Sequence, residues 1–251
     1  MVADTEPLVE WSEALSRLDR ALEGPLPGGA AHARMAPSPR RGWVPGVVPE
    51  GARDAACLFL FFPSDGGSRF VLTLRPAHLA RHAGQVSLPG GAVDPGESVE
   101  EAALRETAEE VGSDPRSIRV LGALSPLHVP VSGFVMRPIV GAARSRPSLR
   151  PQDGEVERIL EPALAEILDP ERRRLETRRI GGTDYDVPYY DLCSRRVWGA
   201  TAMVLSEVAW LLDPPARRGG EGEPGSREGN GVTPRPEPCE PLRSPPRAPS
   251  R

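Results

Sequence analysis

The chain has 251 residues, of which 39% are hydrophobic, and it carries a formal net charge of −4. This length suits one folded domain with appended segments, and the acidic balance gives no reason to expect general binding to nucleic acid. The 30 prolines and 26 glycines exceed average usage and are unevenly distributed. We therefore expect an ordered middle between disordered ends.

No apolar run approaches the roughly 18 residues needed to span a bilayer. The three cysteines lie far apart without a C-x-x-C pair, which is unlike a zinc pattern. Residues 1–6 are acidic and lack the basic start of a signal peptide. We predict a cytoplasmic protein without a membrane partner.

The first predicted element is an N-terminal helix. Its apolar residues recur at spacings of three and four, as on one helix face: Leu8, Trp11, Leu15, Leu18 and Leu22. Residues 23–50 then become rich in Gly, Pro, Ala and Arg, which is typical of a linker or long loop. We expect the helix to dock on its own domain, with a membrane or partner helix as the alternative.

The middle of the chain carries both strand and helix patterns. Apolar, β-branched and aromatic residues predict strands over 56–62 and 69–75, joined at Ser64–Gly67 as in a hairpin. The further elements are a helix over 98–112, strands over 118–124 and 134–140, a short helix over 163–168, a strand over 185–190 and a helix over 200–212. Because strands and helices mix without regular alternation, we predict an α+β fold with a mixed sheet.

The last part of the chain, residues 214–251, consists mainly of Pro, Gly, Arg, Glu and Ser. Such a segment cannot bury enough apolar surface to offset its ordering entropy, so we predict a disordered tail. The predicted organisation is an N-terminal helix and linker (1–50), a folded domain (51–213) and the tail (214–251).

The helix over 98–112 has signals at both ends. Ser98 followed by Glu101 forms a capping box, and Gly112 is a natural C-terminal cap. At about 100° per residue, three glutamates fall within an arc of about 100°: Glu106, Glu109 and Glu110. The roughly opposite face is largely apolar: Leu104, Thr107, Ala108 and Val111. We predict that this apolar face packs on a sheet while the other face presents three carboxylates together.

Three clustered carboxylates are unfavourable in a helix built only for stability, because like charges one turn apart repel. Hard oxygen ligands suit Mg²⁺ or Mn²⁺, which would relieve that repulsion. Arg105 adjoins the glutamates and could orient one carboxylate through a forked hydrogen bond. Judged on the glutamates alone, a solvated acidic helix is the alternative.

The full spacing of this stretch resembles the Nudix box position for position. It runs Gly91, five residues, Glu97, seven residues, Arg105-Glu106, two residues, Glu109-Glu110, one residue, Gly112. Thr107 and Ser113 stand at packing positions where the family usually has bulky aliphatic residues. The resemblance implies the Nudix fold, an α/β/α sandwich with a mixed β-sheet.

The resemblance also implies a reaction and site residues. The family reaction is attack of water on a diphosphate linked to a nucleoside, assisted by divalent metal. Glu106, Glu109 and Glu110 would bind Mg²⁺ or Mn²⁺, as would the carbonyl of Gly90. Arg105 and the three glutamates are the implied catalytic residues. One of these glutamates, or another from a nearby loop, would help activate water.

The segments on either side of the box indicate which substrate is expected. Leu72–Gly91 resembles the corresponding segment of the coenzyme A diphosphatase subfamily, as do Pro126–Phe134 and Val197–Ala202 downstream. Ala80 and Leu88 replace an arginine and a phenylalanine that are usual in that subfamily. The resemblance implies hydrolysis of coenzyme A or acyl-coenzyme A to 3′,5′-ADP and (acyl-)4′-phosphopantetheine.

Coenzyme A carries a 3′-phosphate besides its diphosphate, so a second anion site is needed. Arg75, Arg81 and His82 form a local cationic loop and are candidate phosphate ligands, with surface or structural roles as the alternative. Glu155 is either a further metal ligand or base, or an ordinary loop carboxylate. Trp198 is predicted to lie in the core.

Two other functions remain as alternatives. The first is a Nudix diphosphatase acting on NADH, ADP-ribose or nucleoside triphosphates. The second is a catalytically inactive Nudix module that senses a nucleotide. An inactive module would be expected to lose box carboxylates, and here all three remain beside Arg105. The sequence leaves the oligomeric state open, with a homodimer as one option.

Overall fold

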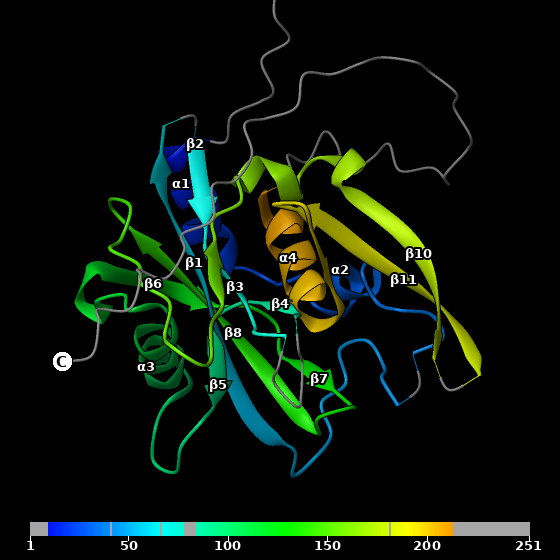
Figure 1. Cartoon of the computed structure of the whole chain (residues 1–251). Helices are drawn as coiled ribbons and strands as arrows, with labels where there is room; N and C mark the ends of the chain where they lie inside the picture. Colours follow the sequence, from blue (N-terminus) through cyan, green and yellow to red (C-terminus); the bar gives the residue numbers. More distant parts are fainter. Residues whose placement is uncertain (1–9, 41, 66, 78–83, 181, 213–251) are drawn as a thin grey trace, which may run out of the picture.

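The computed structural model describes residues 10–40, 42–65, 67–77, 84–180 and 182–212 (Figure 1). The predicted tail and the start of the predicted first helix lie outside these ranges. The helices are α1 (Trp11–Leu22), α2 (Gly29–Ala33), α3 (Val99–Val111) and α4 (Gly199–Leu212), with short 3₁₀ turns at Pro115–Ser117, Leu164–Ile167 and Pro170–Arg172. Among the described residues, no helix is both long and apolar enough to cross a membrane.

The strands form one main sheet and two smaller ones. They are β1 (Arg53–Ser64), β2 (Gly67–Phe70), β3 (Leu72–Leu74), β4 (Val86–Ser87), β5 (Gly90–Ala92), β6 (Ile118–Ala123), β7 (Leu127–Val129), β8 (Phe134–Ala143), β9 (Arg158–Leu160), β10 (Arg173–Ile180), β11 (Thr183–Leu192) and β12 (Arg195–Trp198). The main sheet has the order β2-β1-β8-β6, with β5 paired to β1 and β7 to β8. The smaller sheets are β10-β11-β12 and β4-β3-β9.

The main sheet is mixed, as predicted. Strand β1 runs parallel to β8 and antiparallel to β2 and β5. The β1–β2 pair ends with Ser64 opposite Gly67, which confirms the predicted hairpin. The observed helices and mixed sheet confirm the α+β class.

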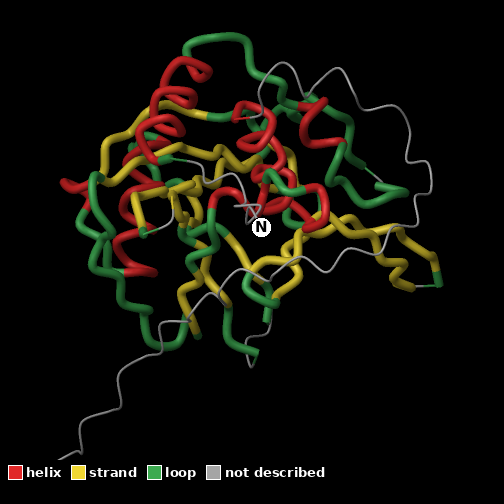
Figure 2. Tube along the Cα trace, turned by 90° about the horizontal axis from the view of Figure 1, so that it is seen from above, coloured by secondary structure: helices red, strands yellow, loops and turns green. Residues whose placement is uncertain are grey.

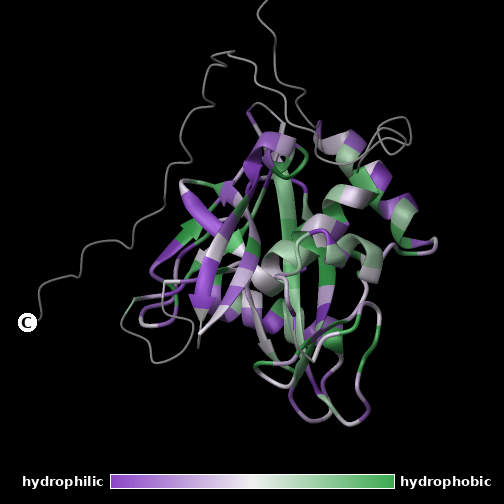
Figure 3. Cartoon of the chain, turned by 90° about the vertical axis from the view of Figure 1, so that its right-hand side faces the viewer, coloured by the Kyte–Doolittle hydropathy of each residue, from purple (hydrophilic) through white to green (hydrophobic). Residues whose placement is uncertain are grey.

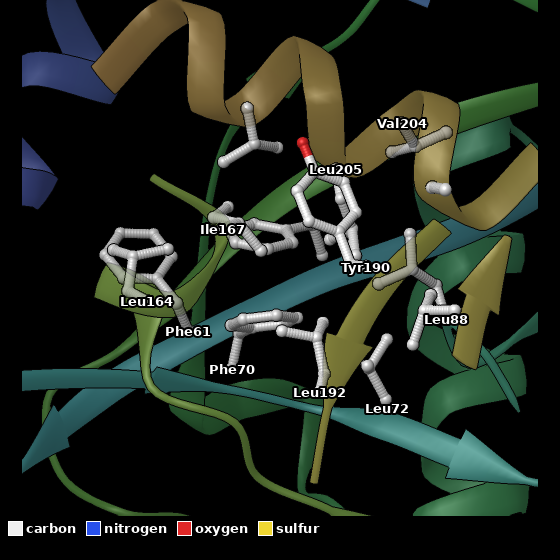
Figure 4. Packing of buried hydrophobic residues seen from close by; sticks show 14 of the residues in the cluster. Phe61, Phe70, Leu72, Leu88, Leu164, Ile167, Tyr190, Leu192, Val204 and Leu205 are labelled. Atoms are coloured by element: carbon white, nitrogen blue, oxygen red, sulfur yellow. The ribbon is translucent and has the colours of Figure 1, made fainter. Parts of the chain in front are cut away.

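Strand β1 is buried on both sides because its apolar side chains alternate between two clusters. Cys57, Phe59 and Phe61 join a cluster with α1 and α4, and Figure 4 shows Phe61 and Tyr190 packed between the strands and α4. The intervening residues join a second cluster with α3: Ala56, Leu58, Leu60 and Phe62. Helices therefore cover both faces of the sheet (Figures 1 and 2), which gives the α/β/α sandwich.

Helix α1 docks on its own domain, as the sequence predicts. Ala14 and Leu18 are fully buried in the cluster that includes α4. The other apolar residues of this helix face pack against the same cluster: Trp11, Leu15 and Leu22. On the exposed side of α1, Arg119 of β6 donates to both carboxylate oxygens of Asp19 at 2.9 Å. The N-terminal helix is therefore part of the folded core.

The stretch after α1 carries more structure than the expected linker. Helix α2 places the Nε2 atom of His32 2.9 Å from the Oε2 atom of Glu207 in α4, and both side chains are buried. Glu207 also accepts hydrogen bonds from the Ser125 hydroxyl at 2.6 Å and the Gly28 N–H at 3.2 Å. Because a buried carboxylate is costly unless it is hydrogen-bonded, these donors tie residues 28–32 to the domain.

Helix α3 has the predicted ends but a different buried face. The Ser98 hydroxyl accepts the Glu101 N–H at 3.2 Å, the Glu101 carboxylate accepts the Ser98 N–H at 2.8 Å, and Gly112 ends the helix in the left-handed conformation. The buried residues are Ala102, Ala103, Thr107, Glu110 and Val111. Leu104 and Ala108 of the predicted face are only half-buried. The two alanines let α3 approach β1 closely, and this orientation turns Glu110 inward.

The sequence patterns do not predict the outer strand β10. Its eight residues include four arginines and a glutamate, and Leu175 is 64% exposed, so no apolar period marks it. The strand forms because it pairs along its whole length with β11. Figure 2 shows this hairpin projecting at one side of the molecule. Figure 3 shows hydrophilic stretches on the outer strands and a largely hydrophobic central strand.

Two buried polar residues, Thr107 in α3 and Ser113 just after it, differ in whether their hydroxyl groups find a hydrogen-bond partner. Thr107 is fully buried, and its hydroxyl donates to the Ala103 carbonyl at 2.6 Å. Ser113 is 3% exposed, and its hydroxyl has no hydrogen-bond partner within the described chain. An unsatisfied buried hydroxyl costs stability, whereas a satisfied one costs little.

Ser113→Ala should therefore stabilise the protein. The change removes the unsatisfied hydroxyl and nearly keeps the volume, so the free energy of unfolding should rise by about 1 kcal/mol. Urea unfolding followed by circular dichroism measures it. Ser117→Ala is the control, because the Ser117 hydroxyl already donates to the Asp114 carbonyl at 2.7 Å, and it should give no increase. A lower unfolding midpoint for Ser113→Ala would contradict the prediction.

Candidate active site

Strand β5 and helix α3 approach each other closely at two glycines. A Cβ atom at Gly91 would lie 2.4 Å from the Glu106 carboxylate. A Cβ atom at Gly90 would lie 2.2 Å from the Ala56 carbonyl oxygen of β1. The Gly90 N–H donates to the Oε2 atom of Glu110 at 3.3 Å. Glycine is therefore required at position 90, where β5 meets β1, and at position 91 it leaves room for the Glu106 carboxylate.

Glu110 is the buried carboxylate of this site. Its side chain is 6% exposed, which overturns the expectation that it lies on the polar face of α3. The pKa of Glu110 is raised to about 7, mainly by burial and further by the carboxylates of Glu106 and Glu155. The Gly90 N–H and Arg75 oppose this rise, and the Arg75 Nη1 atom lies 4.0 Å from Glu110 Oε1. Burial thus disfavours the charged form of the Glu110 carboxyl more than its hydrogen bond and Arg75 favour it.

Arg105 connects the loop before α3 to the helix. Its Nε and Nη2 atoms form a fork on the Glu97 carboxylate at 2.8 and 3.0 Å. Its Nη1 atom donates to Glu106 at 2.9 Å and to Glu109 at 3.2 Å. The carboxylates of Glu97 and Glu106 raise the pKa of Arg105 above its usual range. The fork is thus made with Glu97, and not with one of the three helix glutamates as predicted.

The three predicted metal ligands differ in exposure. The exposed fraction of the side chain is 18% for Glu106, 58% for Glu109 and 6% for Glu110. Within the part of the chain that the structure describes, no three or more His, Cys, Asp or Glu side chains are arranged to hold a metal ion. Glu106 and Glu110 lie at β5, whereas Glu109 faces solvent and pairs with Arg105. Two of the three glutamates are therefore brought together.

These residues fit a hard divalent cation by donor chemistry and charge. Carboxylate and carbonyl oxygens are the ligands that Mg²⁺ and Mn²⁺ prefer. Burial raises the pKa of Glu110, and the carboxylates of Glu106 and Glu155 raise it further; a bound cation would oppose this rise. Glu155, whose role the sequence left open, is thus close enough to act on the site.

Of the three predicted phosphate ligands, Arg75 lies at the site, while Arg81 and His82 fall outside the described residues. Arg75 follows β3, and its N–H donates to the Gln85 carbonyl at 3.0 Å, which continues the pairing of β3 with β4. Its Nε atom is buried and finds no hydrogen-bond partner among the described residues. The guanidinium beside Glu110 therefore keeps a donor that the described residues do not use.

Two residues have contacts that the sequence patterns do not predict. Glu97 anchors Arg105 from eight residues away, and its fixed place in the motif was the available signal. Trp198, predicted to lie in the core, is only half-buried, with the guanidinium carbon of Arg178 4.7 Å from its ring centroid. The alternation of side chains along a strand could have predicted this, because the neighbouring Val197 is fully buried and Trp198 therefore points to the other side.

A mixed sheet between helices, with a glycine strand leading into a capped acidic helix, is the architecture of the Nudix class. The family model of the NUDIX domain matches residues 51–178, and the chain belongs to this family. Nudix hydrolases generally use divalent metal ions such as Mg²⁺ and act on small-molecule substrates.

Curated relatives agree with this assignment. Nudix hydrolase 15, mitochondrial, of Arabidopsis thaliana is 34% identical over 175 residues, which cover 65% of this chain and 60% of that protein. An uncharacterized Nudix hydrolase, NudL, of Pectobacterium atrosepticum is 38% identical over 148 residues, covering 55% of this chain and 72% of that protein. The match thus spans less than two thirds of the plant relative.

Solved structures include chains that match part of this chain. The MutT protein of Methanosarcina mazei Go1 is 17% identical, with a TM-score of 0.41, and the match covers 70% of this chain and 100% of that chain. The Nudix hydrolase RenU of M. smegmatis is 22% identical, with a TM-score of 0.40, and the match covers 46% of this chain and 73% of that chain. Both likenesses concern the fold alone.

Alanine at the two glycines should have different effects. At Gly91 the added methyl meets the end of the Glu106 side chain, which can move. The fold should persist, and turnover of a diphosphate substrate should fall at least about tenfold because the carboxylate is displaced. At Gly90 the methyl meets the backbone of Ala56 and Cys57, so the free energy of unfolding should fall by about 1–3 kcal/mol.

Urea unfolding and steady-state turnover, measured on both variants, separate these effects. Full turnover in Gly91→Ala would show that the position of the Glu106 carboxylate does not matter. Wild-type stability in Gly90→Ala would show that β1 and β5 are not as close as described.

Glu110 should make stability depend on pH when divalent metal is removed by chelator. Its pKa is raised from 4.5 to about 7 in the folded protein, so the folded state binds the proton more tightly than the unfolded state. Stability should therefore fall as pH rises through this interval, by up to about 3 kcal/mol. Glu110→Gln cannot ionise, so it should lose this slope and exceed the wild type above pH 7 or so.

Urea unfolding in chelator between pH 5 and about 8 tests this effect. Glu101→Gln is the control, because hydrogen bonds with Ser98 lower the pKa of Glu101, and it should keep the wild-type slope. Equal slopes in Glu110→Gln and the wild type would contradict the prediction.

Proposed function

We propose that the protein hydrolyses the diphosphate bond of coenzyme A or acyl-coenzyme A, giving 3′,5′-ADP and (acyl-)4′-phosphopantetheine, with Mg²⁺ or Mn²⁺. The observation that carries this proposal is the position of Arg75. This residue belongs to the segment that resembles the coenzyme A diphosphatases, and its guanidinium lies 4.0 Å from Glu110. The segment typical of that substrate class therefore reaches the acidic site.

Each site residue has a role in the proposed reaction. Glu106, Glu109 and Glu110 with the Gly90 carbonyl would hold the divalent cation, which would neutralise phosphate charge and lower the pKa of its bound water. Arg105 holds the carboxylates of Glu106 and Glu109 in place. The guanidinium of Arg75, whose Nε atom has no hydrogen-bond partner among the described residues, would orient substrate phosphate beside Glu110.

Three further assignments rest on the sequence. Arg81 and His82 are proposed to join Arg75 in binding substrate phosphate, because they extend the same cationic loop. A cytoplasmic location and a homodimer stay predictions. The alternative substrates NADH, ADP-ribose and nucleoside triphosphates would use the same carboxylates, so substrate choice must be measured directly.

A substrate panel with product identification tests the proposal. Coenzyme A should give 3′,5′-ADP and 4′-phosphopantetheine, at a higher kcat/KM than NADH, ADP-ribose or a nucleoside triphosphate. Activity should vanish in chelator and return with Mg²⁺ or Mn²⁺, because clustered carboxylates do not supply the required positive charge. Full activity in excess chelator would refute the mechanism, and a strong preference for ADP-ribose would refute the substrate.

Matched glutamine variants make this test specific. Glu110→Gln removes one charge from the metal site, so turnover at limiting metal should fall at least about tenfold, the effect of losing roughly 1.4 kcal/mol. Glu101→Gln serves as the control, since Glu101 caps α3 through Ser98, and it should leave turnover intact. Equal turnover in Glu110→Gln and the wild type would exclude Glu110 as a ligand.

A further inference from the structure

Trp198 is an aromatic residue that the core does not use. It ends strand β12 and is half-buried, whereas the preceding Val197 is fully buried. The guanidinium carbon of Arg178 lies 4.7 Å from the centroid of its ring. The indole is therefore held in place by a cation while part of it remains accessible.

The residues around Trp198 carry excess positive charge. Glu176 of β10 pairs with both Arg178 and Arg196, and the Arg196 Nη1 atom lies 2.7 Å from Glu176 Oε2. Arg196 also lies over the ring of Tyr189, at 5.5 Å from the centroid, and its side chain is 59% exposed. Two guanidinium groups thus share the Glu176 carboxylate, and Asp191 stands opposite Arg196 on β11; the exposed donors of Arg196 can still pair with an anion.

This aromatic and cationic patch is connected to the acidic site through strands β4 and β3. Strand β12 contacts β4, and the Thr201 hydroxyl at the start of α4 donates to the Val86 carbonyl of β4 at 3.4 Å. Strand β4 pairs with β3, where Leu74 faces Val86, and Arg75 follows directly. Trp198 thus ends a strand that contacts β4, and β4 leads to Arg75 through its pairing with β3.

Trp198 and Arg75 each follow a residue whose side chain is buried in the same cluster. Leu74, Val86 and Val197 all join the buried cluster that includes α4. Because side chains alternate along a strand, the residues that follow Leu74 and Val197 face the opposite side. Arg75 meets Glu110 on the side of β3 that faces away from this cluster, and Trp198 lies on the side of β12 that faces away from it.

We propose that Trp198 stacks on the adenine of the substrate and that Arg178 and Arg196 bind its 3′-phosphate. This inference rests on the proposed function, and it names the residues that distinguish coenzyme A from diphosphates without a 3′-phosphate. Aromatic side chains bind bases by stacking, and guanidinium groups pair with phosphate. The diphosphate would then extend from this patch toward Arg75 and Glu110.

Binding of 3′,5′-ADP in the presence of chelator tests the proposal without turnover. Calorimetry on Trp198→Leu should show affinity at least about fivefold weaker than the wild type, and Trp198→Tyr should retain most of it. Trp210→Leu is the matched control, because Trp210 is also half-buried and lies 5.4 Å from the guanidinium carbon of Arg34, but it sits at the other end of α4. It should bind 3′,5′-ADP like the wild type.

Arg196→Gln separates the phosphate contact from stacking. This variant should lose the preference for 3′,5′-ADP over 5′-AMP while still binding 5′-AMP like the wild type. In turnover, Trp198→Leu should raise the KM for coenzyme A with little change in kcat, because the patch lies away from the reacting phosphates.

The outcomes distinguish this inference from the proposed function. If the wild type hydrolyses coenzyme A but Trp198→Leu keeps its KM and its affinity for 3′,5′-ADP, the inference is wrong and the proposed function stands. If the wild type binds 3′,5′-ADP through Trp198 but does not hydrolyse coenzyme A, the patch is supported and the proposed function is wrong. Failure of the wild type to bind 3′,5′-ADP would overturn the inference.

Discussion

The acidic site depends on how closely strand β5 can approach helix α3. Glycine at positions 90 and 91 lets the backbone pass where any Cβ atom would strike Ala56 or the Glu106 carboxylate. The same approach brings the Gly90 N–H to Glu110. The Glu110 carboxylate is therefore hydrogen-bonded to the backbone of β5, and the Glu106 carboxylate lies close to that strand. The carboxylates of Glu106 and Glu110 therefore repel each other. The packing of α3 on β1 keeps them close despite this repulsion.

Arg105 divides its contacts between anchoring and exchangeable partners. The Nε and Nη2 atoms hold Glu97 in a fork, which fixes the loop before α3. The Nη1 atom holds Glu106 and Glu109, two of the residues proposed to bind metal. These two carboxylates can change partner while the fork on Glu97 stays in place. The loop can therefore keep its position whether or not the glutamates contact a cation.

The sequence predicts those features that carry a local signal. The capping box of Ser98 and Glu101 and the apolar run of β1 each specify their element within a few residues. The burial of Glu110 has no such signal, because a helical wheel gives relative directions and not the face that meets β1. Strand β10 is set by its pairing with β11. The hydrogen bond between His32 and Glu207 joins residues 175 positions apart, so no local sequence pattern predicts it.

The buried bond between His32 and Glu207 also decides where the chain can be divided. The family model begins at residue 51, yet Glu207 of α4 accepts hydrogen bonds from His32 and Gly28 upstream of that boundary. A fragment starting at residue 51 would keep, of these donors, only Ser125, and it would uncover the surface that α1 shields. The cooperative folding unit is therefore longer than the region that sequence comparison recognises. Recombinant fragments and fusion junctions are better placed upstream of α1.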